Sequence, residues 1–147
     1  MTQIVYAQEP YVRDWVANQI GQVGYAGNLM NAFGVAEDGL LIGGTVFHNY
    51  YPKEGVIEMS SAATSPRWLS AKMIRTIFSY AFDLLECQMV VMRVSSINTR
   101  MLNIASKFGF DIYPVPRLRG REEGEMICTL TDDQWRSSRF NPKATGG

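Results

Sequence analysis

The sequence predicts a mixed α/β fold, with a central, mostly antiparallel sheet and helices on both of its faces. Short apolar runs separated by turn residues fill the first part of the chain, which is typical of strands in a meander. Beyond Leu69, apolar residues recur at the spacing of an amphipathic helix. A nearly continuous apolar run, Met89–Val94, then predicts a strand covered on both faces. Strand, helix and buried strand in succession predict a right-handed crossover between two parallel strands.

The N-terminal half predicts one strand, one helix and a three-stranded meander. A strand is expected at Thr2–Ala7, and the apolar residues after Pro10 recur at helical spacing as far as Ile20. Three glycines then break the helix and leave a loop to about Asn31, of the kind that covers a site. Turns at Asp38-Gly39 and Pro52–Gly55 separate three further strands, which we expect at Ala32–Ala36, Leu40–Tyr50 and Val56–Ala63.

The C-terminal half predicts a long helix, a second helix and the end of the sheet. The first helix runs from Leu69 to Leu85, and the second is capped by Asn98 and ends at Gly109. Strands are expected near Asp111–Val115 and at Glu125–Leu130, with an arginine-rich loop between them. A capping box at 131–134 starts a short terminal helix at Trp135.

The length and charge of the chain narrow its class. We expect a single domain over residues 1–140 and a flexible tail at 141–147, where Pro, Lys, Thr and Gly are concentrated. Fourteen basic residues balance fourteen acidic ones, so no net charge attracts nucleic acid or an anionic membrane. No apolar run approaches the roughly 18 residues that cross a bilayer, and the N-terminus lacks a signal pattern. We therefore expect a cytoplasmic protein.

The two cysteines, Cys87 and Cys128, are not placed for a metal site. Neither has a Cys or His neighbour at a metal-ligand spacing, so no metal is predicted. Each lies in an apolar stretch, which favours two buried free thiols over a disulfide between them.

The segment Thr64–Lys72 carries the chemistry that is easiest to interpret. It lies between a strand and the start of the strongest helix, where unpaired amides and the helix dipole are able to hold a diphosphate. Arg67 and Lys72 add positive charge. The alternative is purely structural, with Ser65 as a helix cap, Pro66 in the first turn and the two basic residues in solvent.

Three features in order resemble the GNAT superfamily of acyl-CoA N-acyltransferases, and within it the alanine and ribosomal-protein type of N-acetyltransferase. They are the strand and Pro-Arg turn entering a long helix over Glu58–Leu85, the apolar strand leading to Asn98, and the sequence Lys107-Phe108-Gly109-Phe110. The terminal Asp-Gln-Trp and Arg139-Phe140 also resemble this subgroup. The resemblance spans residues 40–140 and implies a GNAT-like fold in which two parallel strands splay apart.

The resemblance implies acetyl-CoA as co-substrate and a set of residues that bind it. The diphosphate is expected on the loop entering the long helix, at Arg67, Trp68, Leu69, Ser70, Ala71 and Lys72. The pantetheine arm is expected to pair with the preceding strand, at Ser61, Ala62, Ala63 and Thr64. Asn98 and Met101 are expected to face the same arm, although a helix cap and a core methionine explain them equally well.

Two positions depart from the family pattern. Trp68 and Ser70 stand where the family usually carries glycine, which allows backbone to approach phosphate closely. Trp68 is expected either to cover part of the coenzyme or to weaken its site. Ala105 stands where many members carry the tyrosine that protonates the leaving thiolate, so that role is vacant or has moved.

Acetyl transfer needs a base, and Glu58 is the candidate, acting directly or through water. The alternative is a solvent-facing strand residue, because side chains alternate between the faces of a strand. His48, the only histidine, is a second candidate, but we expect it near a hairpin end, where histidine is commonly solvated. Ser60 and Ser61 are lesser candidates, which we expect to orient the acetyl group or the thiolate.

These residues favour an N-acetyltransferase acting on a primary amine of a protein N-terminus, a lysine or a small molecule. One alternative is a catalytically degenerate GNAT-fold protein that binds CoA or a partner, and another is an unrelated mixed-sheet binding domain. The resemblance places acceptor choice in Tyr11–Asn31 and Arg117–Glu125 and allows a homodimer. Arginines 117, 119 and 121 favour an acidic substrate, unless they belong to a solvated loop balanced by its glutamates.

Overall fold

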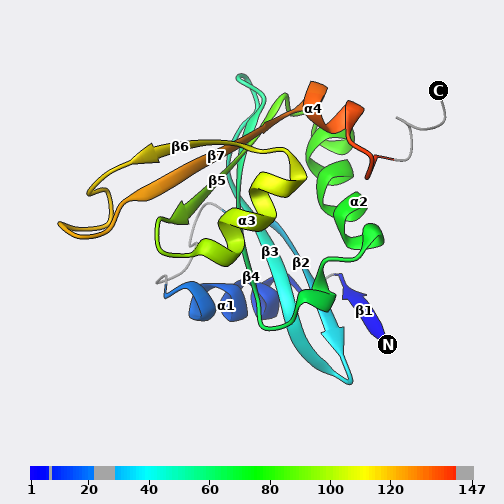
Figure 1. The fold of residues 1–147 in the computed structure, drawn as a ribbon. Helices are drawn as coiled ribbons and strands as arrows, with labels where there is room; N and C mark the ends of the chain where they lie inside the picture. The colour runs from blue at the N-terminus through cyan, green and yellow to red at the C-terminus, as the bar shows by residue number, and fades with distance from the viewer. Residues whose placement is uncertain (7, 22–28, 142–147) are drawn as a thin grey trace.

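A computed structural model describes residues 1–6, 8–21 and 29–141 of the chain, and its arrangement is shown in Figure 1. The elements in order are β1 (Thr2–Val5), α1 (Glu9–Ile20), β2 (Leu29–Glu37), β3 (Leu40–Tyr51), β4 (Val56–Ala63), η1 (Pro66–Trp68), α2 (Ala71–Ser79), η2 (Tyr80–Leu84), β5 (Met89–Ser95), α3 (Thr99–Phe108), β6 (Asp111–Val115), β7 (Glu125–Thr131) and α4 (Asp132–Ser137).

The strands form one sheet in the order β1-β2-β3-β4-β5-β7-β6. Every neighbouring pair is antiparallel except β4 and β5, which are parallel and are connected through α2. The β2–β3 turn has positive φ at both Asp38 and Gly39, which matches the twist of a tight hairpin. The predicted mixed and mostly antiparallel sheet is therefore confirmed.

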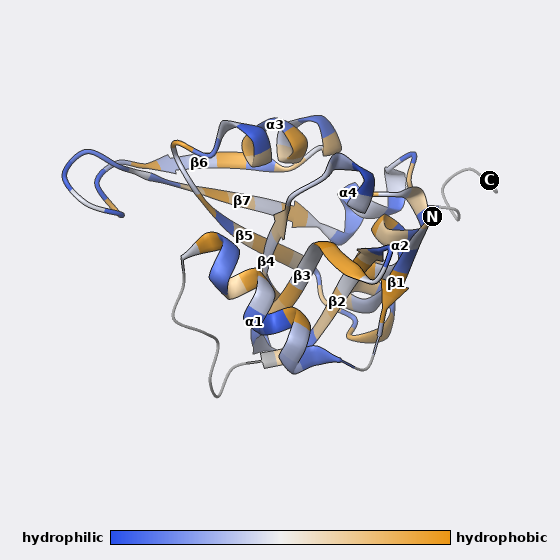
Figure 2. Ribbon diagram, turned by 90° about the horizontal axis from the view of Figure 1, so that it is seen from below, coloured by the Kyte–Doolittle hydropathy of each residue, from blue (hydrophilic) through white to orange (hydrophobic). Residues whose placement is uncertain are grey.

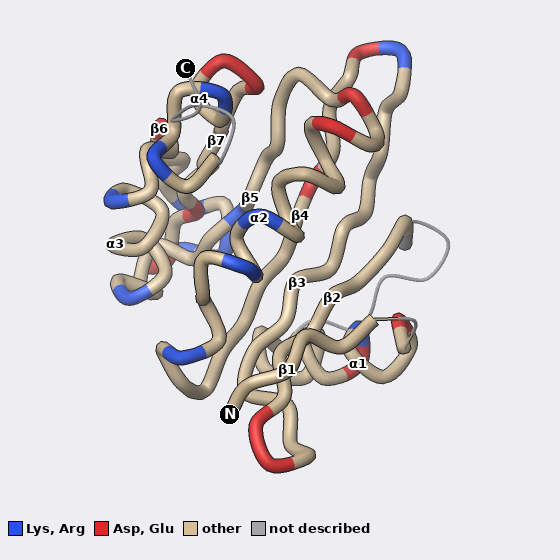
Figure 3. Tube along the Cα trace, turned by 90° about the vertical axis from the view of Figure 1, so that its right-hand side faces the viewer, with Lys and Arg blue, Asp and Glu red and all other residues tan. Residues whose placement is uncertain are grey.

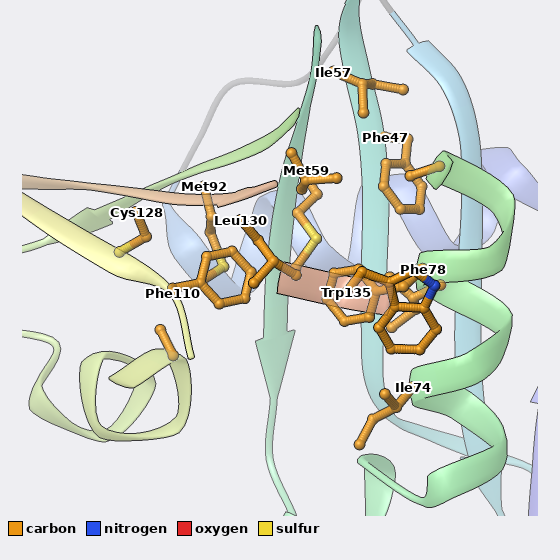
Figure 4. Close-up of a cluster of buried hydrophobic side chains, with 14 of the residues drawn as sticks. Phe47, Ile57, Met59, Ile74, Phe78, Met92, Phe110, Cys128, Leu130 and Trp135 are labelled. Carbon is orange, nitrogen blue, oxygen red and sulfur yellow. The ribbon is translucent and has the colours of Figure 1, made fainter. Parts of the chain in front are cut away.

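Helices cover both faces of this sheet, as predicted. α1 lies on one face, where its Val12 and Val16 pack against Val46 of β3 and Ala62 of β4. α2, α3 and α4 lie on the other face, over the larger apolar cluster (Figures 1 and 2). Figure 4 shows the centre of that cluster, where the ring of Trp135 lies 5.3 Å from that of Phe78.

The long helix predicted from Leu69 to Leu85 is shorter and less regular than expected. Leu69 has a non-helical backbone, and the regular helix begins at Ala71 because the Ser70 hydroxyl accepts a hydrogen bond from the Met73 amide. The last turn, Tyr80–Leu84, widens into a π-helix. Helical spacing of apolar residues predicted the buried face correctly, but it does not distinguish an α-turn from a π-turn.

The terminal predictions have mixed outcomes. Thr131 and Gln134 form the expected capping box, and Gly109 ends α3 in the left-handed conformation. Asn141 contradicts its assignment to a tail, because it is buried and its Nδ2 donates to the Trp135 carbonyl at 3.2 Å. Residues 142–147 lie outside the described residues, as do 22–28 of the predicted loop.

Both cysteines are buried and unpaired, in line with the favoured interpretation. Burial raises the pKa of the Cys87 thiol and raises the pKa of Cys128 to about 11. No described helix is both long and apolar enough to cross a membrane. In the same part of the chain, no group of three or more potential ligands is gathered for a metal ion.

Candidate active site

The parallel strands β4 and β5 pair over only part of their length. The pairing ends where Met59 lies opposite Met92, although β4 continues to Ala63 and β5 continues to Ser95. On their outer sides both strands stay paired to their ends, β4 with β3 and β5 with β7. The predicted parting of two parallel strands is therefore present, and it opens a gap inside the sheet.

Backbone groups of β4 face this gap. The Thr64 amide donates to the Ile42 carbonyl just beyond the end of the β3–β4 ladder, at 2.8 Å. Successive residues of a strand direct their backbone groups to alternate sides, so those of Ser61 and Ala63 point away from β3 and toward β5. They meet no partner strand there, because pairing with β5 has already ended. A ligand with amide groups fits such an edge.

A cleft of about 340 Å³ lies beside the gap, and it is lined largely by apolar and small side chains. It joins the end of β4 to η1 and to the start of α3. Most of the predicted coenzyme residues line it: Ser61, Ala62, Ala63, Trp68, Leu69, Asn98 and Met101. Thr64 and Arg67 are exposed beside it, and neither lines it.

Some backbone amides before and at the start of α2 donate hydrogen bonds within the protein, and others do not. Those of Arg67, Trp68 and Leu69 already donate within the turn that begins at Ser65. Within the described residues, no acceptor lies on the amides of Ser70, which caps α2, or of Ala71 and Lys72, which begin it. The positive end of the helix therefore offers three donors to an anion, shifted toward the C-terminal half of the predicted segment.

Arg67 forms an ion pair with Glu37. Its Nη2 and Nε lie 2.6 and 2.8 Å from the Glu37 carboxylate, which closes the β2–β3 turn. The guanidinium remains exposed to solvent, so a phosphate would have to share it with Glu37. Lys72, by contrast, is exposed and forms no ion pair among the described residues.

A larger cleft of about 680 Å³ opens around the parting of β4 and β5 and contains charged groups. Glu58 lines it, with Oε1 held by the Asn49 side-chain amide at 3.0 Å and Oε2 lying 3.8 Å from Nε2 of His48. The carboxylate is mostly buried and is not the solvent-facing group of the alternative interpretation. Ser60 also lines this cleft, and its hydroxyl lies 2.9 Å from the same His48 nitrogen.

The environment of His48 corrects the expectation of a solvated residue. Only 4% of it is exposed, because β3 continues past it to Tyr51 and pairs it with Glu58. Burial lowers the pKa of His48 from its ordinary value of 6.5, and the nearby Glu58 charge opposes that effect. The imidazole is therefore neutral at neutral pH and lies between a carboxylate and a hydroxyl.

Sequence reasoning missed a cluster of charges on the opposite wall of this cleft. Glu125 of β7 is buried and forms ion pairs with Arg93 of β5 and with Arg119 of the β6–β7 loop. Figure 3 shows both basic and acidic positions in the region of β5 and β7. One signal was available, since Arg93 interrupts the apolar run of a central strand.

Comparisons with known proteins bear on the fold. No family profile and no curated protein sequence matches the chain. Among solved structures, a probable acetyltransferase has a TM-score of 0.63 at 19% identity, over 86% of this chain and 69% of that one. A GCN5-related N-acetyltransferase from Brucella melitensis has a TM-score of 0.63 at 20% identity, over 79% of this chain and 56% of that one. The chain thus spans little more than half of the Brucella protein.

Mutant forms of the spermidine/spermine N-acetyltransferase SpeG from Vibrio cholerae give a TM-score of 0.71 at 11% identity, over 91% of this chain and 96% of that one. This chain has the GNAT fold. Identities as low as these establish the fold and leave the activity to be argued from the site.

Trp68 departs from the glycine usual in GNAT proteins, and its position explains how it is tolerated. It is buried at 3% exposure and packs into the sheet against Gly43, where an added Cβ would lie 2.4 Å from the Trp68 Cβ. The indole thus forms part of the wall of the smaller cleft. Gly43 of β3 supplies the missing space, which no pattern in the 64–72 segment could reveal.

The α3 residues of the GNAT pattern have clear positions. The Asn98 side chain accepts from the Met101 amide as a helix cap and also lines both clefts. Met101 is largely buried and lines them too. Ala105 is buried one turn further along and offers no hydroxyl. Ser60 and Ser61 are the hydroxyl groups of β4 at the parting of the strands.

Proposed function

We propose that this protein is an N-acetyltransferase that moves an acetyl group from acetyl-CoA to a primary amine. The parting of β4 and β5 after Met59 and Met92 carries the proposal. It joins a mostly apolar cleft, beside backbone donors and the positive end of α2, to a second cleft that contains a carboxylate. A long thioester carrier with amide groups and a diphosphate suits the first cleft, and an amine suits the second.

The chemistry assigned to the residues follows from proton balance. The amine nitrogen forms a bond to the carbonyl carbon while the carbon–sulfur bond breaks, so the amine gives up a proton and the sulfur gains one. Glu58 is the base, because its Oε2 is the carboxylate atom not held by Asn49. Backbone amides of β4 facing the gap stabilise the charge that develops on the carbonyl oxygen.

Protonation of the sulfur falls to a group other than the usual tyrosine, since Ala105 occupies that position. We assign it to Ser60, whose Oγ lies 2.9 Å from His48. Ser60 regains its proton through the neutral imidazole of His48 from Glu58, which took that proton from the amine and lies 3.8 Å from the same imidazole nitrogen. Ser60 and His48 together therefore take the role that the tyrosine has in many GNAT proteins.

Two measurements test the function separately. Acetyl-CoA should raise the melting temperature in a saturable way, because a ligand that binds only the folded state stabilises it. Release of coenzyme thiol should then depend on an added amine. No rise in melting temperature at millimolar acetyl-CoA would reject the proposal, and so would a rise that is accompanied by no thiol release across a broad amine panel.

A second candidate is a degenerate GNAT-fold protein that binds CoA without turnover. The ion pair of Arg67 with Glu37 and the absence of a hydroxyl at Ala105 favour it. It predicts the same thermal stabilisation by acetyl-CoA but no amine-dependent thiol release. The thiol assay therefore separates the two candidates.

A further inference from the structure

Two arginines share one buried carboxylate in the wall of the larger cleft. Glu125 is 4% exposed, and each of its oxygens contacts a different guanidinium. Nε of Arg93 donates a hydrogen bond to Oε2 at 2.8 Å, and Nη2 of the same side chain forms an ion pair with Oε2 at 2.6 Å. Nε of Arg119 donates to Oε1 at 3.1 Å, and its Nη2 forms an ion pair with Oε1 at 2.9 Å. The carboxylate therefore holds both arginines in fixed orientations.

The charges in this group do not cancel. One carboxylate faces two guanidinium groups, and neither arginine forms an ion pair with any other described residue. Each arginine uses Nε and Nη2 for Glu125, so its Nη1 donors have no acceptor among the described residues. Both side chains line the cleft and are partly exposed, 46% for Arg93 and 37% for Arg119. This group of three residues thus carries one unit of positive charge and presents free Nη1 donors to the cleft, which Glu58 and Glu123 also line.

Glu123 lines the same cleft, but it does not neutralise this charge by direct contact. Its Oε2 accepts a hydrogen bond from the Ser95 hydroxyl, and it forms no ion pair with either arginine. The β6–β7 loop is also held to the end of β5 by the Ser96 amide, which donates to the Gly124 carbonyl at 3.0 Å. The loop therefore presents Arg119 from a fixed backbone, since guanidinium and main chain are both anchored.

We propose that the acceptor carries a carboxylate as well as the reacting amine, and that Arg93 and Arg119 bind this carboxylate. The inference rests on the proposed function and specifies its substrate class. Arginine is suited to the role, because its planar donors match the two oxygens of a carboxylate. Glu58, on β4, binds the amine of the acceptor. The two arginines, on β5 and in the β6–β7 loop, bind its carboxylate. Free amino acids and peptides with an acidic residue next to the amine both have this chemistry.

The test compares matched acceptors that differ only in the carboxylate. One arm uses ω-amino acids of increasing chain length against the corresponding alkylamines, and the other uses short peptides with Asp or Asn in the second position. We expect kcat/KM for thiol release to favour the carboxylate member by at least about tenfold in one arm, the effect of one charged hydrogen bond. Binding is measured in parallel as the rise in melting temperature, which does not require turnover.

Variants then assign the preference to these arginines. Arg119→Gln keeps Glu125 paired with Arg93, and it should lower the ratio of carboxylate to neutral acceptor by about tenfold. Arg121→Gln makes the same charge change at an exposed position of the same loop and should leave the ratio within about twofold. Glu123→Gln removes a negative charge from the cleft and should raise the ratio.

The outcomes separate this inference from the proposed function. Turnover of plain amines without any carboxylate preference would overturn the inference and leave the transferase standing. Equal loss of preference in Arg119→Gln and Arg121→Gln would also overturn it, since the effect would then be one of general charge. If the protein turns over no amine, the melting temperatures still test the carboxylate site. A rise with the carboxylate probes that is lost in Arg119→Gln supports the site, and no rise with these probes in the wild type rejects it.

Discussion

The two clefts at the parted strands are lined by different types of residue. The smaller is lined mostly by small or apolar residues, among them Ala63, Trp68 and Leu69. The larger contains Glu58, His48 and the Arg93–Glu125–Arg119 group. A coenzyme whose amides and diphosphate do not vary is suited to backbone donors, because their positions are fixed by the fold. A ligand that must be selected and deprotonated needs side chains, whose charge and pKa depend on the sequence.

This contrast predicts that changes in the larger cleft affect turnover, whereas changes in the smaller cleft affect stability and coenzyme binding together. The two effects are separable because, apart from Ser61, which lines both clefts, β4 contributes different residues to each. Glu58 and Ser60 face the larger cleft, and Ala63 lines only the smaller.

The largest expected effect is that of Glu58→Gln. The amide keeps the shape of the side chain and still accepts the hydrogen bond from Asn49, but it is no longer able to take a proton. We expect kcat to fall about 10²- to 10⁴-fold in the thiol-release assay. Thermal stabilisation by acetyl-CoA should be unchanged, and this measurement is the control. An unaltered kcat with the same pH dependence would remove Glu58 from the role of base.

Gly43→Ala tests the smaller cleft. The new Cβ would lie 2.4 Å from Cβ and 2.5 Å from Cγ of Trp68, so the indole has to move. We expect a loss of about 1–3 kcal/mol in the free energy of unfolding, together with weaker stabilisation by acetyl-CoA. Gly44→Ala is the matched control: its nearest contacts, with Val12 and Val16 of α1, are at 3.0 Å. The contrast between the clefts fails if Gly44→Ala weakens coenzyme binding as much as Gly43→Ala does.

Asn98 separates a structural role from a coenzyme contact. Asn98→Ala removes the cap of α3 and should cost about 1 kcal/mol of stability by chemical denaturation. Asn98→Asp keeps an oxygen that caps the helix, but it brings a negative charge to both clefts. We expect Asn98→Asp to retain stability while weakening coenzyme binding. If both variants bind acetyl-CoA like the wild type, Asn98 is only a cap.

The smallest expected effect concerns the pH dependence of stability. Burial holds the pKa of His48 below its ordinary value of 6.5, so the unfolded chain takes up a proton first as the pH falls. This group therefore stabilises the fold above its ordinary pKa, and the contribution is lost as the pH falls through the lowered value. Denaturant unfolding between about pH 7.5 and pH 5.5 should show a shallower loss for His48→Gln. An equal or steeper loss in that variant would contradict the buried neutral imidazole.

The smaller cleft was largely predictable from the sequence, and the larger was not. The segment 64–72 and Asn98 are local signals, because a helix start and its cap depend on residues adjacent in the chain. The roles of His48 and Glu125 depend on pairings between strands distant in sequence. His48 pairs with Glu58, and Glu125 pairs with Ser95, two residues along β5 from Arg93. Strand alternation predicts that one face is polar, but it does not specify which polar residues meet. Trp68 shows the same limit, since Gly43 makes room for it from another strand.

Amide hydrogen exchange of β4 and the start of α2, with and without saturating acetyl-CoA, shows whether the coenzyme binds at the gap between β4 and β5. We expect slower exchange at Ser61 and Ala63, where backbone groups face the gap, and at Ser70–Lys72, with no change in β1. Unchanged exchange at Ser61 and Ala63 in a protein that acetyl-CoA stabilises would contradict binding at the gap, because the coenzyme would then bind elsewhere.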